Sequence, residues 1–184
     1  MASLSNFKSA LQYGGARPAL FDMTIFSPLL TGVDLGAMSF HCNVSAIPPL
    51  TVTPIEKQYF GRTVKIPGDI VFGDLSTTII NAEDYKVRNS IEVWMDNINT
   101  TVDNEGFSDN DSWAASASLR QYGKDGNALI DYDFWDIWPT TISEIALSYD
   151  TASDIEQFDV TWAYNYYTQT GGTAPATAGN ATQG

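Results

Sequence analysis

A strict alternation of apolar and polar residues is the feature that most constrains how this chain folds. The pattern occurs at residues 21–25, 38–46, 145–149 and 157–166. Successive side chains of a β-strand point to opposite faces, so the alternation predicts strands with one buried and one polar face. Such strands are typical of antiparallel sandwiches and barrels. Further strands are predicted near residues 50–57, 62–67, 74–80, 114–122 and 128–137.

Two segments depart from this pattern. Between residues 84 and 98 apolar side chains recur at helical spacing, and Asn81 or Asp84 is placed to cap the start of that helix. Residues 3–13 predict a short amphipathic helix or a flexible arm, because so short a helix is marginal on its own. The expected fold is therefore mainly β: two packed antiparallel sheets in a sandwich or barrel-like arrangement, with one flanking helix and a short N-terminal helix.

The length of 184 residues suits one domain, which we place at residues 1–167. Residues 168–184 form a low-complexity tail that cannot build a core. Charged residues make up only 17% of the chain, against about 25% in ordinary globular proteins. This shortage indicates that part of the surface is covered by other copies or partners.

The charge of the chain excludes a protein that grips nucleic acid. Acidic residues number 22 and basic residues 9, for a formal net charge of −13. Phosphate binding requires clustered Lys and Arg, so we expect that the protein can surround DNA without specific binding. No signal peptide or membrane-spanning run is evident, and Cys42 has no cysteine to pair with. We therefore expect synthesis in the cytoplasm and no membrane insertion of the monomer.

Catalytic candidates are few. Asp131 and Asp133 share one face of a predicted strand, and two carboxylates can act as acid and base in glycoside hydrolysis. A solvated strand face is the favoured interpretation, because such faces are common. His41 and Cys42 are neighbours on a predicted strand and point to opposite faces, so they do not form a nucleophile pair. The sequence thus predicts no enzyme.

An acidic loop at residues 99–112 holds the one set of candidate metal ligands. The loop offers carboxylate oxygens of the kind that Ca²⁺ prefers, but their spacing does not match a calcium-binding loop. The candidates are Asp103, Glu105, Asp109 and Asp111. A solvated loop is the favoured interpretation, and we predict no metal and no cofactor.

Several short motifs follow one another in a characteristic order. They are ARPALF (16–21), FHC (40–42), AIP (46–48), LRQY (119–122), WPT (138–140), EIAL (144–147) and IEQFDVT (155–161). In this order and spacing, residues 16–167 resemble the tail tube proteins of T-even-like contractile phages. The chain departs from the short family form in a longer connection at residues 26–38 and in the tail after residue 167.

The resemblance implies a fold and an assembly. Members of this family pack two antiparallel sheets with a flanking helix, related to the type VI secretion tube protein. Six copies form a ring whose sheets join into one inner barrel, and rings stack into a tube inside a contractile sheath. The implied protein is a structural virion component that is assembled in the host cytoplasm and conducts DNA. Its implied partners are further copies of itself, the sheath protein, the baseplate and the tail terminator.

The segment at residues 47–68 is expected to form a hairpin that reaches the next ring. Its cations would complement an acidic neighbour, and its aromatic residues would supply buried area. The inter-ring residues we predict are Lys57, Tyr59, Phe60, Arg62 and Lys65. An ordinary solvated hairpin is the alternative.

Acidic residues are expected to line the lumen or to face the sheath. Asp131, Asp133 and Asp159 are the candidates, and the sequence does not separate the two surfaces. A secretion-system or bacteriocin tube is an alternative within the same class. A carbohydrate-binding β-sandwich is an alternative from another class, because the five Trp and nine Tyr residues could stack on sugars.

Overall fold

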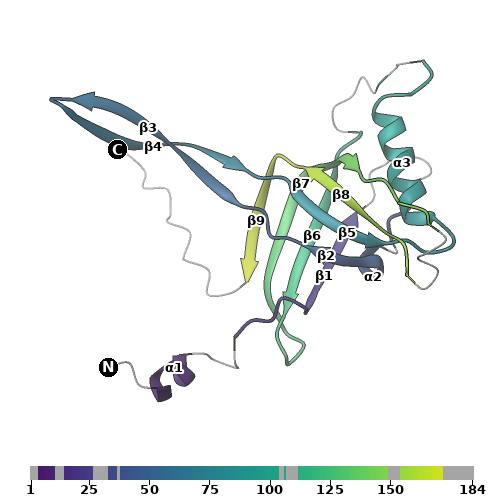
Figure 1. The fold of residues 1–184 in the computed structure, drawn as a ribbon, viewed down its shortest axis with the longest axis horizontal. Coiled ribbons are helices and arrows are strands. Elements are labelled where there is room, and N and C mark those ends of the chain that lie inside the picture. Colours follow the sequence, from purple (N-terminus) through teal and green to yellow (C-terminus); the bar gives the residue numbers. More distant parts are fainter. Residues whose placement is uncertain are drawn as a thin grey trace.

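The computed structural model describes residues 4–10, 15–26, 33–36, 38–103, 106, 112–148 and 154–171. Its strands are β1 (Phe21–Phe26), β2 (Cys42–Ser45), β3 (Leu50–Tyr59), β4 (Arg62–Phe72), β5 (Leu75–Ile80), β6 (Ala115–Tyr122), β7 (Ala128–Ile142), β8 (Gln157–Ala163) and β9 (Tyr166–Gly171). Its helices are α1 (Leu4–Ala10), α2 (Met38–His41) and α3 (Lys86–Ile98). The mainly β class, with two antiparallel sheets, a flanking helix and a short N-terminal helix, is confirmed (Figure 1).

Strand β7 belongs to both sheets. Its first part lies between β6 and β9, and β6 also pairs with β1, which gives the order β1-β6-β7-β9 (sheet A). Its last part, from Trp138, pairs with β8, which pairs with β5, and β5 pairs with β2. These strands form the order β7-β8-β5-β2 (sheet B). The strand bends at Asp136, which has a φ of 55° and lies in a bulge of the β6–β7 register. Asn165 secures this corner by donating its side-chain N–H to the Asp136 carboxylate at 2.9 Å.

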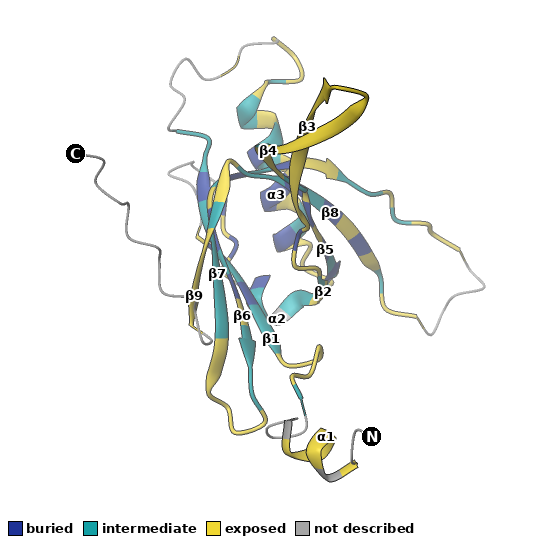
Figure 2. Ribbon diagram, turned by 90° about the vertical axis from the view of Figure 1, so that its left-hand side faces the viewer, coloured by how far each residue is buried: buried dark blue, intermediate teal, exposed yellow. Residues whose placement is uncertain are grey.

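The core lies between the apolar faces that the alternation predicts. Phe158, Val160 and Trp162 on β8 are buried, as expected for one side of a half-buried strand. Helix α3 lies between the sheets towards one end (Figure 2), and its Trp94 ring packs 5.9 Å from that of Trp162. Burying side chains of this size stabilises the fold by about 1.5–3 kcal/mol each.

The N-cap position of α3 is Tyr85, in a left-handed conformation with a φ of 52°, so neither Asn81 nor Asp84 occupies the predicted cap position. The Asp84 carboxylate accepts the backbone N–H of Lys86 at 3.2 Å, which satisfies a donor that the helix leaves free. Asn81 instead donates to the carboxylate of Glu156 at 3.0 Å. Helix α3 therefore begins two residues after Asp84, within the predicted range of 84–98.

Two predicted strands differ in the structure. Residues 38–46 begin with helix α2, because Met38 closes a turn on Leu35 (N···O 2.9 Å) and both side chains are buried there. Strand β7 ends at Ile142, so residues 145–148 of the strand predicted at 145–149 lie outside any strand, and Tyr149 lies outside the described residues. Both segments alternate in sequence, but alternation does not supply a pairing strand.

Strands β3 and β4 form an arm that projects from the body (Figure 1). They pair only with each other, and every residue of β3 is exposed (Figure 2). The arm extends the β2–β5 pair of sheet B, and the backbone N–H of Gly73 donates to Pro49 O at 3.0 Å where it leaves the body. The hairpin predicted at residues 47–68 is present, and its second strand extends beyond the expected end to Phe72.

Candidate functional site

The tip of the β3–β4 arm is a two-residue turn in which Phe60 holds a position where Asn or Gly is usual. Phe60 and Gly61 have φ values of 45° and 72°, as a type I′ hairpin turn requires. Asn or Gly suits both positions, whereas a bulky aromatic side chain with positive φ is strained. Phe60 is 91% exposed, and its ring centroid lies 4.7 Å from that of Tyr59 in an edge-to-face arrangement. Backbone strain of this kind is common at functional sites, so we expect the Phe60 side chain to contact another molecule.

The register of the arm sorts its side chains onto two faces. Residues directly opposite each other in an antiparallel pair share a face. The pairs Ile55–Ile66, Lys57–Val64 and Tyr59–Arg62 therefore lie together, and we name these six residues the contact face. Ile55 and Ile66 are each about half exposed, although their type is normally buried. The opposite face carries polar pairs such as Gln58–Thr63.

The cations of the arm differ in their partners. Lys65 lies on the polar face and pairs with Glu56 at 2.9 Å. Lys57 and Arg62 lie on the contact face and make no ion pair with any described residue. The structure thus brings Lys57, Tyr59 and Arg62 together, with Phe60 beside them at the turn. It places Lys65 on the other side.

Sequence reasoning missed the apolar half of the contact face. Ile55, Val64 and Ile66 sit among Thr, Pro and Lys residues and show no clear alternation across both strands. The available signal was the turn, because a two-residue loop at Phe60-Gly61 fixes which residues oppose each other.

The outward face of sheet A holds two of the acidic candidates. Arg120 donates to both oxygens of Asp131, at 2.7 and 3.0 Å, and these bonds raise the pKa of the Arg120 guanidinium above its usual value. Asp133 shares this face, as do Trp135 and Tyr166, whose rings stack 6.3 Å apart and are nearly half exposed. Both oxygens of the Asp131 carboxylate therefore accept hydrogen bonds from Arg120 within the sheet, and the group serves as a structural partner of that side chain.

The third acidic candidate lies on the other sheet. Asp159, on the outward face of sheet B, accepts a hydrogen bond from the Thr78 hydroxyl at 2.7 Å. Its neighbours on this face include Ser76, Thr161 and Gln157. None of the four strands of sheet B contains Lys or Arg. Asp159 therefore does not form one surface with Asp131 and Asp133.

The remaining chemical candidates are not assembled into a site. Burial raises the pKa of the Cys42 thiol to about 11, and Cys42 donates to Val44 O at 3.5 Å. Within the described ranges no three His, Cys, Asp or Glu side chains gather as metal ligands. Of the acidic-loop candidates only Asp103 is described, since Glu105, Asp109 and Asp111 lie outside the described residues. Among the helices described, none has the length and apolar character needed to cross a membrane.

Solved structures share this fold. A chain of an extracellular contractile injection system, solved as a PVC sheath-tube complex in the extended state, superposes with a TM-score of 0.62 at 13% identity, covering 93% of this chain and 99% of that chain. A chain from the anti-feeding prophage cap, described as a tube terminating cap, gives a TM-score of 0.61 at 12% identity, covering 85% and 91%.

Sequence relatives match over most of the chain. The tail tube protein gp19 of Enterobacteria phage T4 is 29% identical over 155 residues, covering 83% of this chain and 90% of that protein. The tail tube protein of Serratia phage KSP90 is 25% identical over 166 residues, covering 86% and 92%. The family model described as phage tail tube protein matches residues 18–170. By this match and by its fold, the chain belongs to the phage tail tube protein family.

Proposed function

We propose that this chain is a structural protein without a catalytic centre, and that six copies form rings that stack into the tail tube. The observation that carries the proposal is the contact face, which exposes apolar side chains and two unpaired cations at the end of a projecting arm. An uncovered surface of this kind on a soluble β-protein marks a place where another chain binds. A sixfold ring agrees with a structural neighbour, the anti-feeding prophage baseplate, which is described as 6-fold symmetrised.

Ring closure follows from the edges of sheet B. Its four strands alternate in direction, so its two edge strands, β7 and β2, run in opposite senses. One copy's β2 can therefore pair with the next copy's β7 without breaking the antiparallel order. Such a head-to-tail interface closes into a ring when the rotation between copies is right.

The outward face of sheet B then lines the channel. Lys and Arg would hold DNA phosphates, and the strands of sheet B contain neither. Asp159 adds like charge, so DNA passes without specific binding. Sheet A, with Arg120 and the exposed Trp135, lies on the outer side of the wall. This arrangement assigns Asp159 to the lumen and Asp131 and Asp133 to the sheath side.

Stacking places the contact face on the next ring. With a net charge of −13, a neighbouring copy is acidic on average, which complements Lys57 and Arg62. Tyr59 and Phe60 supply aromatic area of the kind that dominates protein interfaces. Lys65 contributes less than expected, because Glu56 already neutralises it.

Electron microscopy of the purified protein tests the stacking. The wild type is expected to form tubes, and the variant Lys57→Glu/Arg62→Glu to stop at rings or monomers. The control is Lys8→Glu/Lys124→Glu, which makes the same change in net charge at two exposed residues away from the contact face and should still form tubes. Normal tubes from the first variant would refute the assignment.

Phage carrying charge-reversed tubes test the lumen. Asp159→Lys is expected to slow DNA ejection while sheath assembly proceeds, because a ring of cations would hold the DNA backbone. Asp133→Lys is expected to impair sheath assembly and to leave ejection unchanged in the tails that form. The reverse outcome would exchange the two surfaces.

Partners at the ends and outside of the tube follow from the same model. We propose the sheath protein on the outer wall, with baseplate and terminator proteins at the two ends, as named for the structural neighbours. Assembly takes place in the host cytoplasm and the product is part of the virion. Trp94 and Trp162 are buried and cannot stack on sugars, which removes two of the five Trp residues from the carbohydrate-binding alternative.

A further inference from the structure

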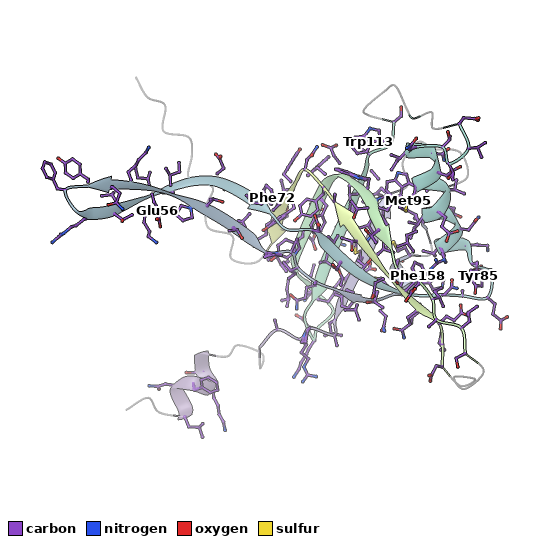
Figure 3. The ribbon with its side chains drawn as sticks, turned by 45° about the horizontal axis from the view of Figure 1, so that its top comes forward. Glu56, Phe72, Tyr85, Met95, Trp113 and Phe158 are labelled. Atoms are coloured by element: carbon purple, nitrogen blue, oxygen red, sulfur yellow. The ribbon has the colours of Figure 1, made fainter. Side chains whose placement is uncertain are left out.

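The arm joins the body through a group of packed aromatic rings, which we name the root cluster. It consists of Phe72, Tyr132, Phe134, Tyr164 and Tyr167. Phe72, the last residue of β4, lies where the arm meets the body (Figure 3). Its ring centroid is 5.4 Å from that of Tyr167 and 6.1 Å from that of Tyr164. Phe134 is fully buried and packs 5.0 Å from Tyr164, which ties the cluster to the core. Edge-to-face pairs of this kind stabilise a contact beyond the area that they bury.

Backbone contacts hold both strands of the arm at the same point. The Tyr164 hydroxyl donates to Gly73 O at 2.6 Å, immediately after β4. Burial raises the pKa of Tyr164 to about 12, so the phenol keeps the proton it donates. On the other strand, Pro49 packs so closely on Gly73 that a Cβ there would lie 2.7 Å from Pro49 Cγ. The root is therefore a tight contact and not a loose linker.

Beyond the root the arm lacks strand pairing to any other described part of the chain. Its strands pair only with each other, and a lone two-stranded ribbon is marginally stable in water. The direction of the contact face relative to the body therefore depends on the root cluster.

We propose that the root cluster positions the arm, with Phe72 and Tyr164 as positioning residues that aim the contact face before the next ring arrives. This inference rests on the proposed role of the arm in stacking. Holding a binding element in its bound direction removes the ordering cost of association. If only one arm in ten points correctly, the concentration needed for stacking rises about tenfold.

Spin-label distances test the positioning in the monomer. Labels at Phe60→Cys and Asn89→Cys, in a Cys42→Ser background, report the separation of the arm tip from α3. A narrow distance distribution is expected, and Phe72→Leu should broaden it. The control Phe26→Leu removes an exposed ring from β1 and should leave the width unchanged. A broad distribution in the parent, or no change with Phe72→Leu, would overturn the proposal.

Elongation from wild-type tube ends tests the consequence for assembly. Phe72→Leu should elongate about tenfold more slowly while forming rings at the wild-type concentration. Tyr164→Phe, which removes only the hydroxyl, should slow elongation by less, and Tyr166→Phe should not slow it. Normal elongation by Phe72→Leu, or an equal loss of rings, would contradict the positioning role. If the wild-type protein formed no tubes, the proposed function would be wrong. The width of the spin-label distance distribution tests the role of the root cluster independently of tube formation.

Discussion

The body and the arm use the same side chains in opposite ways. Ile79 in β5 is fully buried, whereas Ile66 in β4 is 49% exposed, although both are β-branched residues in regular antiparallel pairs. In the body the apolar side of each strand meets a second sheet or α3. In the arm the apolar side meets nothing in the described chain. Strand formation and the covering of its apolar face are therefore separate events, and in the proposed assembly another copy covers the apolar face of the arm.

The largest expected effect is a difference in the free energy of unfolding between alanine variants of these two isoleucines. Ile79→Ala should lower the free energy of unfolding by about 2–5 kcal/mol, because it leaves a cavity in a packed core. Ile66→Ala should change it by less than about 0.5 kcal/mol and should instead weaken tube formation. Urea unfolding of the monomer measures the first quantity and light scattering the second. Equal destabilisation by both variants would mean that the arm folds onto the body.

Alkaline pH should loosen the root of the arm. The pKa of Tyr164 is about 12 in the folded state, above its ordinary value of 10.0, so folding favours the neutral phenol. The resulting stability is fully present below pH 10 and is lost as the pH rises from 10 towards 12. The distance distribution between spin labels at Phe60→Cys and Asn89→Cys should broaden over this window, and Tyr164→Phe should remove that dependence. Tyr166→Phe serves as control, and an unchanged pH profile in Tyr164→Phe would contradict the assignment.

A substitution in the turn at the tip should have a smaller effect, and it should change monomer stability and tube elongation in opposite directions. Phe60→Asn places a residue that tolerates positive φ before Gly61, so it should stabilise the isolated arm by about 0.5–1 kcal/mol. The same change removes an exposed ring from the proposed interface, so it should weaken elongation. A variant that gains monomer stability and elongates normally would show that Phe60 makes no contact in the tube.

The smallest effect concerns the paired cation. Lys65→Ala removes an exposed salt bridge to Glu56, which contributes at most about 1 kcal/mol. Because Lys65 lies on the polar face, its loss should leave elongation close to that of wild type, whereas Lys57→Ala should reduce it. Sedimentation of tubes formed by the two variants compares them directly. Equal losses would mean that both faces of the arm are buried on stacking.

Most of the fold could be predicted from local periodicity. Apolar residues recur at helical spacing in α3, at Val87, Ile91 and Trp94, and at every second residue of β8, from Phe158 to Trp162. Each pattern repeats often enough to identify the type of element. Met38 and Phe40 alternate as a strand would, yet Met38 closes a helical turn on Leu35, a contact that local pattern does not contain.

The site was only partly predictable, for a related reason. The sequence placed cations and aromatics at the tip of a hairpin, but pairing register decides that Lys57 and Lys65 lie on opposite faces. It also left Asp131 and Asp159 undivided, because only the order of the strands shows that they lie on different sheets. β9 extends to Gly171, where Thr and Gln residues gave no apolar signal.

The passage of β7 from one sheet to the other has a mechanical consequence. A single covalent backbone, from Ala128 to Ile142, runs through both layers, with the bend at Asp136 between them. A force that slides one layer past the other therefore loads peptide bonds and whole ladders of hydrogen bonds, and not side-chain packing alone. A wall built from such subunits resists splitting into its layers when it is pushed along its length.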